Sequence, residues 1–482
     1  MPSNSLFSDV PHPSATDYLL KFFSHPPTPQ QHQLFHKLND FVLSPDGQKT
    51  TFLLKGYAGT GKTSVIKALA KTLRKFHYRV VLLAPTGRAA KVVAQHTRRK
   101  SYTIHRQIYK QVQNPYSGSV EFKLRKNYQK RAVFVVDEAS MINHEPRSGE
   151  TSMLTDLIEY VFGHPNNKLV IIGDPAQLPP VGHSSSAALN AEVLQYVYQL
   201  HVLEHQLTEV VRHTTQSGIL ANATVLRNAL PQTDDAAPAA VSIHTKSYPD
   251  IFHMPQERLN EGLSYAYLKY GLQQTLLISP SNRETVRYNQ LIRQSILHRQ
   301  QTVEPGDLLM VTRNNYRALP KGFPLSFLAN GEFVEVEEVL TTESRYGFTF
   351  MNLRLRLPDY PRQSPFEGKI LLPTLNSTTP SLSDAQNKQL YDAIAEDYQH
   401  IARPSQRLKA IRKDEYLNAL QVKFAYALTG HKAQGGQWKC VFVSPGYLTD
   451  AAPNADILRW LYTAFTRATQ ELYLIDFPAA YG

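Results

Sequence analysis

The chain has 482 residues, of which 42% are hydrophobic, and its formal net charge is +12 at neutral pH. This length exceeds what one hydrophobic core supports and predicts about three to four domains, and the excess of base favours a polyanionic partner, nucleic acid first, with a generally basic surface as the alternative. The single cysteine, Cys440, excludes a disulfide framework and a cysteine-based zinc site and fits an intracellular, reducing compartment, while no apolar run approaches the roughly 18 residues of a membrane span.

The N-terminal residues 1–27 are polar and proline-bearing and are expected to form a flexible tail. An amphipathic helix should follow them, because Thr28 suits an N-cap and Pro29 suits the first helical position. Gln31 lies in the first turn of this helix. Its amide both donates and accepts hydrogen bonds and therefore suits an adenine ring, with an ordinary surface glutamine as the alternative.

Residues 56–63, with the sequence GYAGTGKT, fit the pattern G-x-x-x-x-G-K-[ST] of a phosphate-binding loop. The run 51–54 before them is apolar and β-prone, and the apolar residues after them recur at helical spacing, so the loop joins a strand to a helix. In such a loop Lys62 reaches the β- and γ-phosphates and the Thr63 hydroxyl ligates Mg²⁺. The sequence therefore predicts ATP and Mg²⁺ as cofactors. The expected nucleotide ligands are Gly56, Ala58, Gly59, Thr60, Gly61, Lys62 and Thr63.

A second predicted strand, 80–84, ends in a turn that suits nucleic acid. The carboxyl ends of parallel strands face the ligand crevice of an open sheet, and this strand ends at Pro85, Thr86 and, shortly after, Arg88. Small residues beside a cation suit a contact with a phosphate backbone, although an ordinary strand-to-helix turn is the alternative. Thr103 and His105 follow along the chain and are assigned to the same nucleic-acid contact.

Residues 107–127 leave the α/β alternation and are expected to form an inserted β-hairpin, because two apolar runs flank a turn that contains proline and glycine. Phe122 and Tyr116 are its candidate aromatic residues for stacking on a base where two strands part. A surface flap is the alternative.

Two further apolar strands end in residues that suit catalysis. The strand 132–136 delivers Asp137, which would hold Mg²⁺ through its water shell, and Glu138, which would accept a proton from the attacking water. Two acids at the end of a buried strand are costly unless a cation or hydrogen bonds compensate. The strand 169–172 leads to Gln177, which would sense the γ-phosphate, and to Pro179, which stiffens a relay toward a second site.

The motifs GYAGTGKT, APTGRAAK, DEASM and GDPAQLPPV follow one another in an order that resembles superfamily 1 helicases, and within them the RecD-like and phage Dda-like group, which moves 5′ to 3′. The resemblance implies further site residues. Arg212 would reach the γ-phosphate across the cleft, and Arg467 would be the arginine finger. His431, Gln434 and Gly435 match a motif that bridges DNA and nucleotide.

The second half repeats the layout of a strand followed by a polar turn, with Asn282 after the strand 276–279. This predicts a second RecA-like lobe with nucleic acid or nucleotide at its strand ends. The expected fold is therefore α/β, with two RecA-like lobes of the P-loop NTPase type. The expected domains are lobe 1 at 28–205, lobe 2 at 206–300 and 425–482, and between the two parts of lobe 2 an SH3-like all-β insert with a helical arm at 301–424.

These expectations describe an ATP-dependent DNA helicase that translocates on single-stranded DNA, unwinds fork DNA, works as a monomer and has no membrane partner. An RNA helicase on the same core, a non-motor P-loop enzyme such as a small-molecule kinase, and a regulatory ATPase that clamps DNA without moving are the alternatives.

Overall fold

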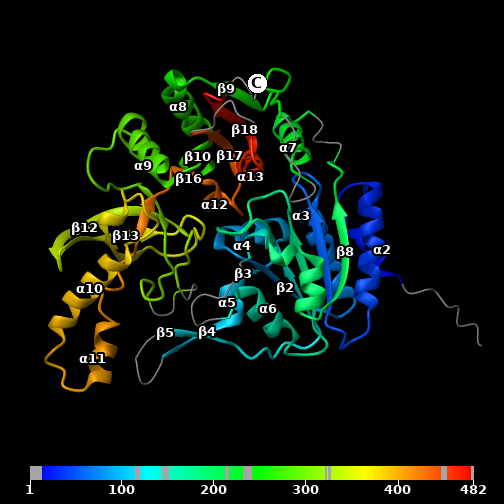
Figure 1. Cartoon of the computed structure of the whole chain (residues 1–482), viewed down its shortest axis with the longest axis horizontal. Coiled ribbons are helices and arrows are strands. Elements are labelled where there is room, and N and C mark those ends of the chain that lie inside the picture. The colour runs from blue at the N-terminus through cyan, green and yellow to red at the C-terminus, as the bar shows by residue number, and fades with distance from the viewer. Residues whose placement is uncertain are drawn as a thin grey trace, which may run out of the picture.

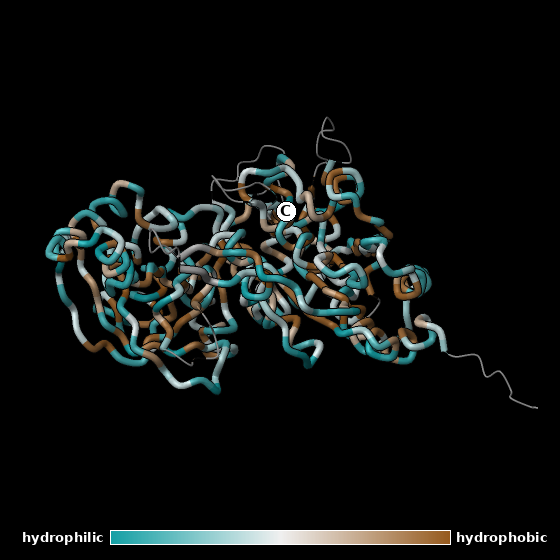
Figure 2. The backbone as a smooth tube through the Cα atoms, turned by 90° about the horizontal axis from the view of Figure 1, so that it is seen from below, coloured by the Kyte–Doolittle hydropathy of each residue, from teal (hydrophilic) through white to brown (hydrophobic). Residues whose placement is uncertain are grey.

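The computed structural model describes residues 13–113, 120–142, 144, 151–211, 216–231, 241–320, 323, 327–446 and 453–478. Within them the chain forms two parallel α/β sheets, one five-stranded antiparallel sheet and a separate pair of strands (Figure 1). The α/β class is therefore confirmed. Figure 2 shows the hydrophobic segments running through the interior, with hydrophilic segments around them. Among the described residues no helix is both long and apolar enough to cross a membrane.

The first lobe is a six-stranded parallel sheet in the order β3-β2-β6-β7-β1-β8. Its strands are β1 (Thr50–Gly56), β2 (Arg79–Ala84), β3 (Ser101–Thr103), β6 (Ala132–Val136), β7 (Lys168–Gly173) and β8 (His201–Leu207). Its helices are α1 (Ala15–Phe22), α2 (Pro29–Leu43), α3 (Lys62–Lys75), α4 (Gly87–Thr97), α5 (Ile104–Ile108) and α6 (Met153–Phe162). Successive residues of β6 enter different cores: Val133 and Val135 pack with α1–α3, whereas Phe134 and Val136 pack with α5 and α6. The sheet is thus covered on both faces, which is why its strands read as continuous apolar runs.

The expectation of a flexible tail over residues 1–27 is wrong for 15–22, which form α1. Ser14 caps this helix with a capping box in which Asp17 bonds back to the cap. Ala15 and Leu19 are fully buried in the same core as α2 and α3. The serine and the aspartate three residues later were the signal in the sequence.

The second lobe is a five-stranded parallel sheet in the order β16-β10-β17-β18-β9. Its strands are β9 (Ile251–Met254), β10 (Thr275–Ser279), β16 (Ala427–Thr429), β17 (Trp438–Val443) and β18 (Ala468–Ile475). Its helices are α7 (Gly218–Asn228), α8 (Leu259–Tyr270), α9 (Asn282–Leu291), α12 (Gly430–Ala433) and α13 (Ala455–Phe465). Because β16 and β17 lie on either side of β10, two segments far apart in the sequence complete one sheet.

The insert between the two parts of the second lobe is a five-stranded antiparallel sheet in the order β14-β13-β12-β11-β15. Its strands are β11 (Leu308–Val311), β12 (Phe333–Arg345), β13 (Phe348–Arg356), β14 (Phe366–Leu371) and β15 (Val422–Phe424). The arm helices α10 (Asp384–Asp397) and α11 (Pro404–Ile411) pack on Phe348, Phe350 and Leu371. Separately, β4 (Tyr109–Gln113) pairs antiparallel with β5 (Val120–Leu124), while Tyr116 and the rest of 114–119 lie outside the described residues.

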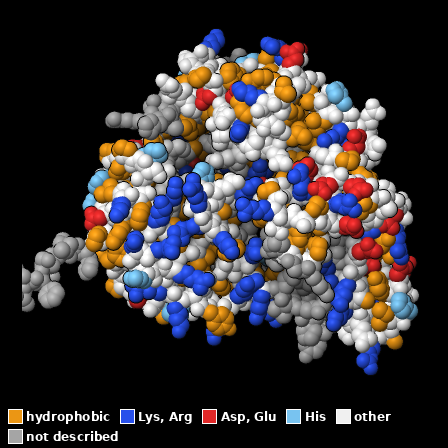
Figure 3. Space-filling view, turned by 180° about the vertical axis from the view of Figure 1, so that it is seen from behind, with side chains coloured by type: hydrophobic (Ala, Val, Ile, Leu, Met, Phe, Trp, Pro, Cys, Tyr) orange, Lys and Arg blue, Asp and Glu red, His pale blue; other side chains and the backbone are white. Residues whose placement is uncertain are grey.

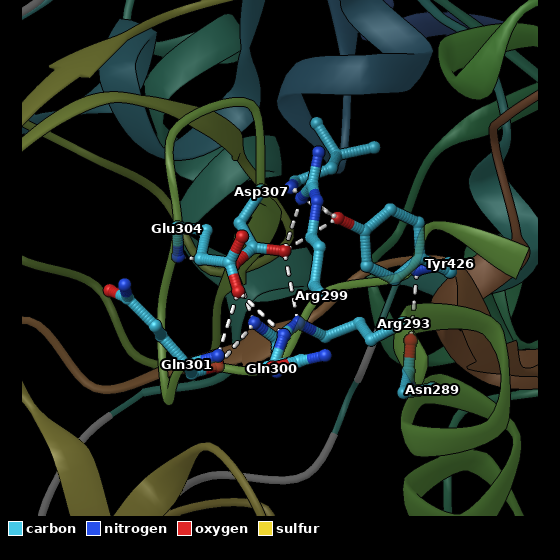
Figure 4. Close-up of polar contacts among 9 residues, drawn as sticks. Asn289, Arg293, Arg299, Gln300, Gln301, Glu304, Asp307 and Tyr426 are labelled. Carbon is cyan, nitrogen blue, oxygen red and sulfur yellow. Dashed lines mark hydrogen bonds and ion pairs between the residues drawn. The ribbon is translucent and has the colours of Figure 1, made fainter. Parts of the chain in front are cut away.

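A buried charge cluster joins the β insert to the second lobe (Figure 4). Asp307, just before β11, is fully buried and accepts hydrogen bonds from Arg293 at 3.0 Å, from the Tyr426 hydroxyl at 2.8 Å and from Arg299. Asn289 holds Tyr426 in place by accepting from its backbone N–H at 2.9 Å. The Asp307 carboxylate therefore pairs with two arginines at the point where the chain passes from the second lobe into the insert. Through Tyr426 it also holds the point where the chain returns to the lobe.

We expect Asp307→Asn to lower the free energy of unfolding by about 3–5 kcal/mol, because it leaves two buried arginine cations without the carboxylate that balances their charge. Chemical unfolding of the two proteins measures the difference. Glu338→Gln is the matched control: its pair with Arg354 lies on the surface, with side chains 51% and 44% exposed, so its cost should stay within about 1 kcal/mol. Equal costs for both variants would contradict the structural role of the cluster.

Candidate functional site

The loop at 56–63 joins the end of β1 to the start of α3. Gly59 and Gly61 have φ angles of 75° and 88°, in the left-handed region that favours glycine. A Cβ atom on Gly61 would also lie 2.7 Å from the side-chain nitrogen of Gln31, so that side chain would have to move. Thr60 fixes the turn by donating its hydroxyl hydrogen to the Tyr57 carbonyl at 2.8 Å. The loop therefore has the shape that its sequence motif predicts.

The ammonium group of Lys62, at the start of α3, lies against the first residues of this loop. Its Nζ donates to the carbonyl oxygens of Gly56 at 2.6 Å and Tyr57 at 2.9 Å. The same nitrogen lies 3.7 Å from Oδ2 of Asp174, a residue with no exposed surface. The amine is thus paired with protein groups at the place where a phosphate chain would enter.

Asp137 and Glu138 follow the buried strand β6. Glu138 adopts the left-handed region, with φ 54°, and its N–H donates to Oδ1 of Asp137 at 2.9 Å. Burial, and after it the charge of Glu138, raise the pKa of Asp137 to about 7, whereas the charge of Lys62 acts in the opposite direction. The two acids and the loop lysine therefore share one site that a cation would stabilise.

The donors at this site fit Mg²⁺ better than a metal held by protein alone. Thr63 and Asp137 are hard oxygen ligands. Among the described residues no three His, Cys, Asp or Glu side chains cluster as a metal cage. A cation here would complete its shell with water and phosphate oxygens, as Mg²⁺ usually does.

The segment Asp174–Leu178, after β7, is held by the second lobe. Oδ2 of Asp174 accepts from the Tyr462 hydroxyl at 2.6 Å, and the Leu178 N–H donates to Oγ1 of Thr463 at 2.9 Å. The Leu178 carbonyl accepts from the side chain of Gln434 at 2.6 Å. Arg459 donates to the Pro175 carbonyl. We call these contacts the interlobe seam.

Gln177 and Pro179 line one cavity of about 490 Å³ beside the seam. Gln177 is 5% exposed, and its side-chain oxygen is buried without a hydrogen-bond partner among the described residues. A buried polar atom without a partner is unusual in a native structure and suits a residue that forms a hydrogen bond only when a ligand is bound.

Tyr462, on α13, reaches the phosphate loop from the second lobe. Its hydroxyl accepts from the Ala58 N–H at 2.8 Å while it donates to Asp174. Burial raises the pKa of this phenol well above its usual value, so the hydroxyl stays protonated and remains a donor. Tyr462 was not among the expected site residues, and its only signal in the sequence was its place five residues before Arg467.

Arg227, on α7, also lies against the loop and was also missed. Its guanidinium stands 4.3 Å from the centre of the Tyr57 ring, and its Nη2 donates to the Thr208 carbonyl at 3.0 Å. Its Nε is buried without a partner among the described residues. No motif surrounds Arg227 in the sequence, so only the packing of α7 on the loop reveals it.

Of the two arginines expected to sense the γ-phosphate, the structure describes only Arg467. Arg212 lies outside the described residues. Arg467 is 4% exposed and donates to the carbonyls of Thr463 at 3.0 Å and Gly436 at 3.2 Å and to the Thr466 hydroxyl at 3.0 Å. Its guanidinium therefore faces its own lobe rather than the cleft, because three acceptors there satisfy its fork.

Gln31 also differs from its expected role. Its side-chain oxygen accepts from the Thr28 N–H at 3.0 Å in a capping box, and its nitrogen donates to the Thr60 carbonyl at 3.0 Å. Both polar atoms of the amide are thus used to support the phosphate loop, and Gln31 is 2% exposed. An adenine ring would have to displace these contacts.

Most of the expected nucleic-acid ligands line one cavity of about 330 Å³, to which the first lobe, the second lobe and the β insert all contribute. From the first lobe come Pro85, Thr86, Arg88, Thr103 and His105, from the second lobe His431 and Gln434, and from the insert Asn314, Phe327 and Asn330. Gly435 closes the contact between lobes, because a Cβ atom there would lie 2.8 Å from that of Ala89. Asn282 is not among the lining residues and begins α9 instead.

Arg88 is placed differently from the expected phosphate contact. Its guanidinium lies between the rings of Phe333 and Trp438, at 4.3 and 4.1 Å from their centres. Burial lowers the pKa of this group. Arg88 therefore joins the first lobe to the insert and the second lobe through cation–π contacts, which compete with an exposed role.

Phe122, on β5, packs in an aromatic cluster rather than standing free. Its ring centre lies 4.7 Å from that of His105 and 4.4 Å from that of Tyr316. Tyr316 in turn lies 4.9 Å from Phe327 in the cavity wall. The cluster braces the hairpin strands against the β insert.

Comparison with known proteins gives two family matches. Residues 40–244 match the AAA domain family and residues 424–475 match the UvrD-like helicase C-terminal domain family. The "Uncharacterized protein R530" of Acanthamoeba polyphaga mimivirus is 24% identical over 87% of this chain and 94% of its own. The ATP-dependent RecD2 DNA helicase of Deinococcus radiodurans is 29% identical over 36% of this chain and 21% of its own. A crystal structure of Pif1 helicase from Bacteroides with ADP-AlF3 and ssDNA is 15% identical, with a TM-score of 0.46 over 95% of this chain and 94% of that chain.

Proposed function

We propose that this chain, a superfamily 1 helicase of the RecD-like group, couples ATP hydrolysis to movement along single-stranded DNA and so unwinds duplex DNA. One observation carries the proposal: the interlobe seam touches both candidate sites. At one end Tyr462 bonds to Ala58 in the phosphate loop, and at the other end Gln434 lines the cavity of the expected strand ligands. A change at the nucleotide is thereby passed to the strand.

The chemistry follows from the residues of the first lobe. Lys62 would exchange its carbonyl partners for the β- and γ-phosphates, and Thr63 and Asp137 would hold Mg²⁺, which would neutralise phosphate charge. Glu138 accepts a proton from the attacking water. Gln177 would sense the γ-phosphate through its amide nitrogen, which donates, while its side-chain oxygen, without a partner among the described residues, can accept from the attacking water.

The second lobe responds through Tyr462 and Arg227. Phosphate in the loop competes with the Tyr462 hydroxyl for the N–H groups of the loop and offers an anion to the Arg227 guanidinium. Either event shifts α13 and the seam. His431 and Gln434 then move relative to Thr86 and His105, which is the relative movement that a stepping motor needs.

The finer parts of the proposal rest on the resemblance of the motifs. They are movement in the 5′ to 3′ direction, a preference for DNA, and activity as a monomer at a fork. The domain limits proposed above place the motor in the two lobes and the strand-parting hairpin at 107–127.

The test is ATPase activity with and without single-stranded nucleic acid. We expect single-stranded DNA to stimulate hydrolysis at least about tenfold, because closure of the cleft and occupation of the cavity are coupled. An ATPase indifferent to nucleic acid would point to a non-motor P-loop enzyme. Stimulation by RNA alone would point to an RNA helicase.

Arg467→Lys and Arg227→Gln are expected to separate catalysis from stability. Arg227→Gln should lower turnover of bound ATP, since it removes the guanidinium that lies against the phosphate loop. Arg467→Lys should mainly lower the melting temperature, because Arg467 is buried and its three hydrogen bonds lie within its own lobe. Single-turnover hydrolysis and thermal melting measure the two effects. Full turnover in Arg227→Gln would remove Arg227 from the cleft chemistry.

Phe122→Ala is expected to slow unwinding while DNA-stimulated ATPase stays largely intact. The change removes the ring that packs against Tyr316 of the insert and His105 of the first lobe, but it does not touch the nucleotide site. Parallel helicase and ATPase assays measure the split, and Tyr196→Ala is the control, because Tyr196 is an aromatic residue of the first lobe that is 80% exposed. Unwinding at the wild-type rate would reduce the hairpin to a surface flap.

A further inference from the structure

The positive charge of the chain is concentrated in one stretch of the first lobe. Residues 61–131 contain 18 of the 52 Lys and Arg residues but only one of the 40 acidic residues, Glu121. The rest of the chain therefore has 34 basic and 39 acidic residues, a net charge of −5. The overall charge of +12 thus hides a strongly basic segment in an otherwise slightly acidic protein.

The fold brings the cations of this stretch to the amino ends of three neighbouring strands. We define the amino-edge surface as Arg74, Arg79, Arg98, Lys100, Lys130 and Arg131, all of them exposed. The N–H of Arg79, at the start of β2, donates to the Arg131 carbonyl at 3.0 Å, and β3 begins one residue after Lys100. Burial, and after it the charge of Arg74, lower the pKa of Arg99. The ends of α3 and α4 therefore meet at this edge.

This surface lies away from the nucleotide. In a parallel sheet the carboxyl ends of the strands carry the phosphate loop and the catalytic acids, so the amino ends lie at the opposite edge. Figure 3 shows Lys and Arg side chains gathered over the left and centre of this face and Asp and Glu side chains gathered at its right. Neither the hydrolytic site nor the strand cavity uses any of the six residues.

The six cations of the amino-edge surface have no acidic partner among the residues that the structure describes. Within the described ranges none of them forms an ion pair. Asp46 is an acid in the same region as Arg131. After burial, which has the largest effect, the charge of Asp46 raises the pKa of Tyr78 and of Lys168, and the charge of Arg131 lowers both. Like charges gathered in this way repel one another and lower stability unless an external polyanion balances them.

The position of the hairpin indicates which polyanion binds the amino-edge surface. Residues 125–131 run directly from β5 into the amino-edge surface, and the hairpin strands lie on the side of the first lobe that faces away from the second lobe (Figure 1). We propose that the amino-edge surface binds the phosphate backbone of the duplex DNA that the hairpin opens. The proposal rests on the proposed helicase function. The contact reads phosphates and so has no sequence preference.

The test is the triple variant Arg79→Gln/Lys130→Gln/Lys100→Gln, with Lys388→Gln/Lys409→Gln/Lys413→Gln on the exposed face of the arm as a control of equal charge change. Anisotropy titrations measure affinity for a blunt duplex and for a single strand at several salt concentrations. We expect the first variant to bind duplex at least about tenfold more weakly and to lose about two to three units of salt slope. Its affinity for the single strand and its single-strand-stimulated ATPase should be retained.

Three outcomes would overturn the proposal: unchanged duplex affinity, an equal loss in the control variant, or a loss confined to the single strand, which would assign the surface to a displaced strand. The fold is checked by thermal melting, and a glutamine at these exposed positions leaves the core intact. Absence of single-strand-stimulated ATPase in the wild-type protein would overturn the proposed function itself. The two failures are therefore distinguishable.

Discussion

Glu138→Gln is expected to bind ATP normally and to hydrolyse it at least about 100-fold more slowly. The carboxamide keeps the shape of the side chain but cannot accept a proton from water at neutral pH. Glu138 follows a strand with no exposed residue, and its left-handed backbone fixes where the side chain begins. Single-turnover hydrolysis beside nucleotide-binding titrations measures the split.

The matched control for this change is Glu159→Gln, since Glu159 lies exposed on α6 of the same lobe. It should leave turnover at the wild-type rate. Near-normal turnover in Glu138→Gln would assign the base role to another group.

Lys62→Ala is expected to abolish hydrolysis. The change removes the cation that would meet the β- and γ-phosphates, and it leaves the fully buried Asp174 without the nearby ammonium group. Steady-state ATPase activity measures the loss. Lys67→Ala, further along α3, is the control and should hydrolyse ATP normally. Activity of the Lys62 variant within tenfold of wild type would mean that the loop does not hold the reacting phosphates.

The sequence predicted the parts of the site that depend on local pattern. A glycine-rich loop between a strand and a helix, and acids at the end of an apolar strand, define their own surroundings. Because the carboxyl ends of parallel strands share one edge, Thr86 and His105 could also be expected to lie together, and with His431 they line one cavity.

Contacts between lobes could not be predicted in the same way. Tyr462 and Arg227 reach the phosphate loop only because α13 and α7 pack across it, and nothing within a few residues of either one records that packing. The same limit explains Arg88 and Arg467. Each has a motif around it, but Arg88 packs on Phe333 from a distant part of the chain, and Arg467 donates to the distant Gly436 as well as to its neighbours Thr463 and Thr466.

The predictions for Gln31 and for α1 differ from the structure for another reason, which is local. In both cases a capping box was present in the sequence, at Thr28 with Gln31 and at Ser14 with Asp17. A polar side chain three residues after a cap has a local use, and that use competes with any role at a ligand.

The central claim is a motor that moves 5′ to 3′ along one DNA strand and parts a duplex. ATP-dependent unwinding of three matched duplexes, with a 5′ tail, a 3′ tail or no tail, tests it most directly. The account predicts unwinding of the 5′-tailed duplex, little or none of the other two, and none without ATP. Unwinding that required a 3′ tail, or ATP hydrolysis with no unwinding of any duplex, would contradict it.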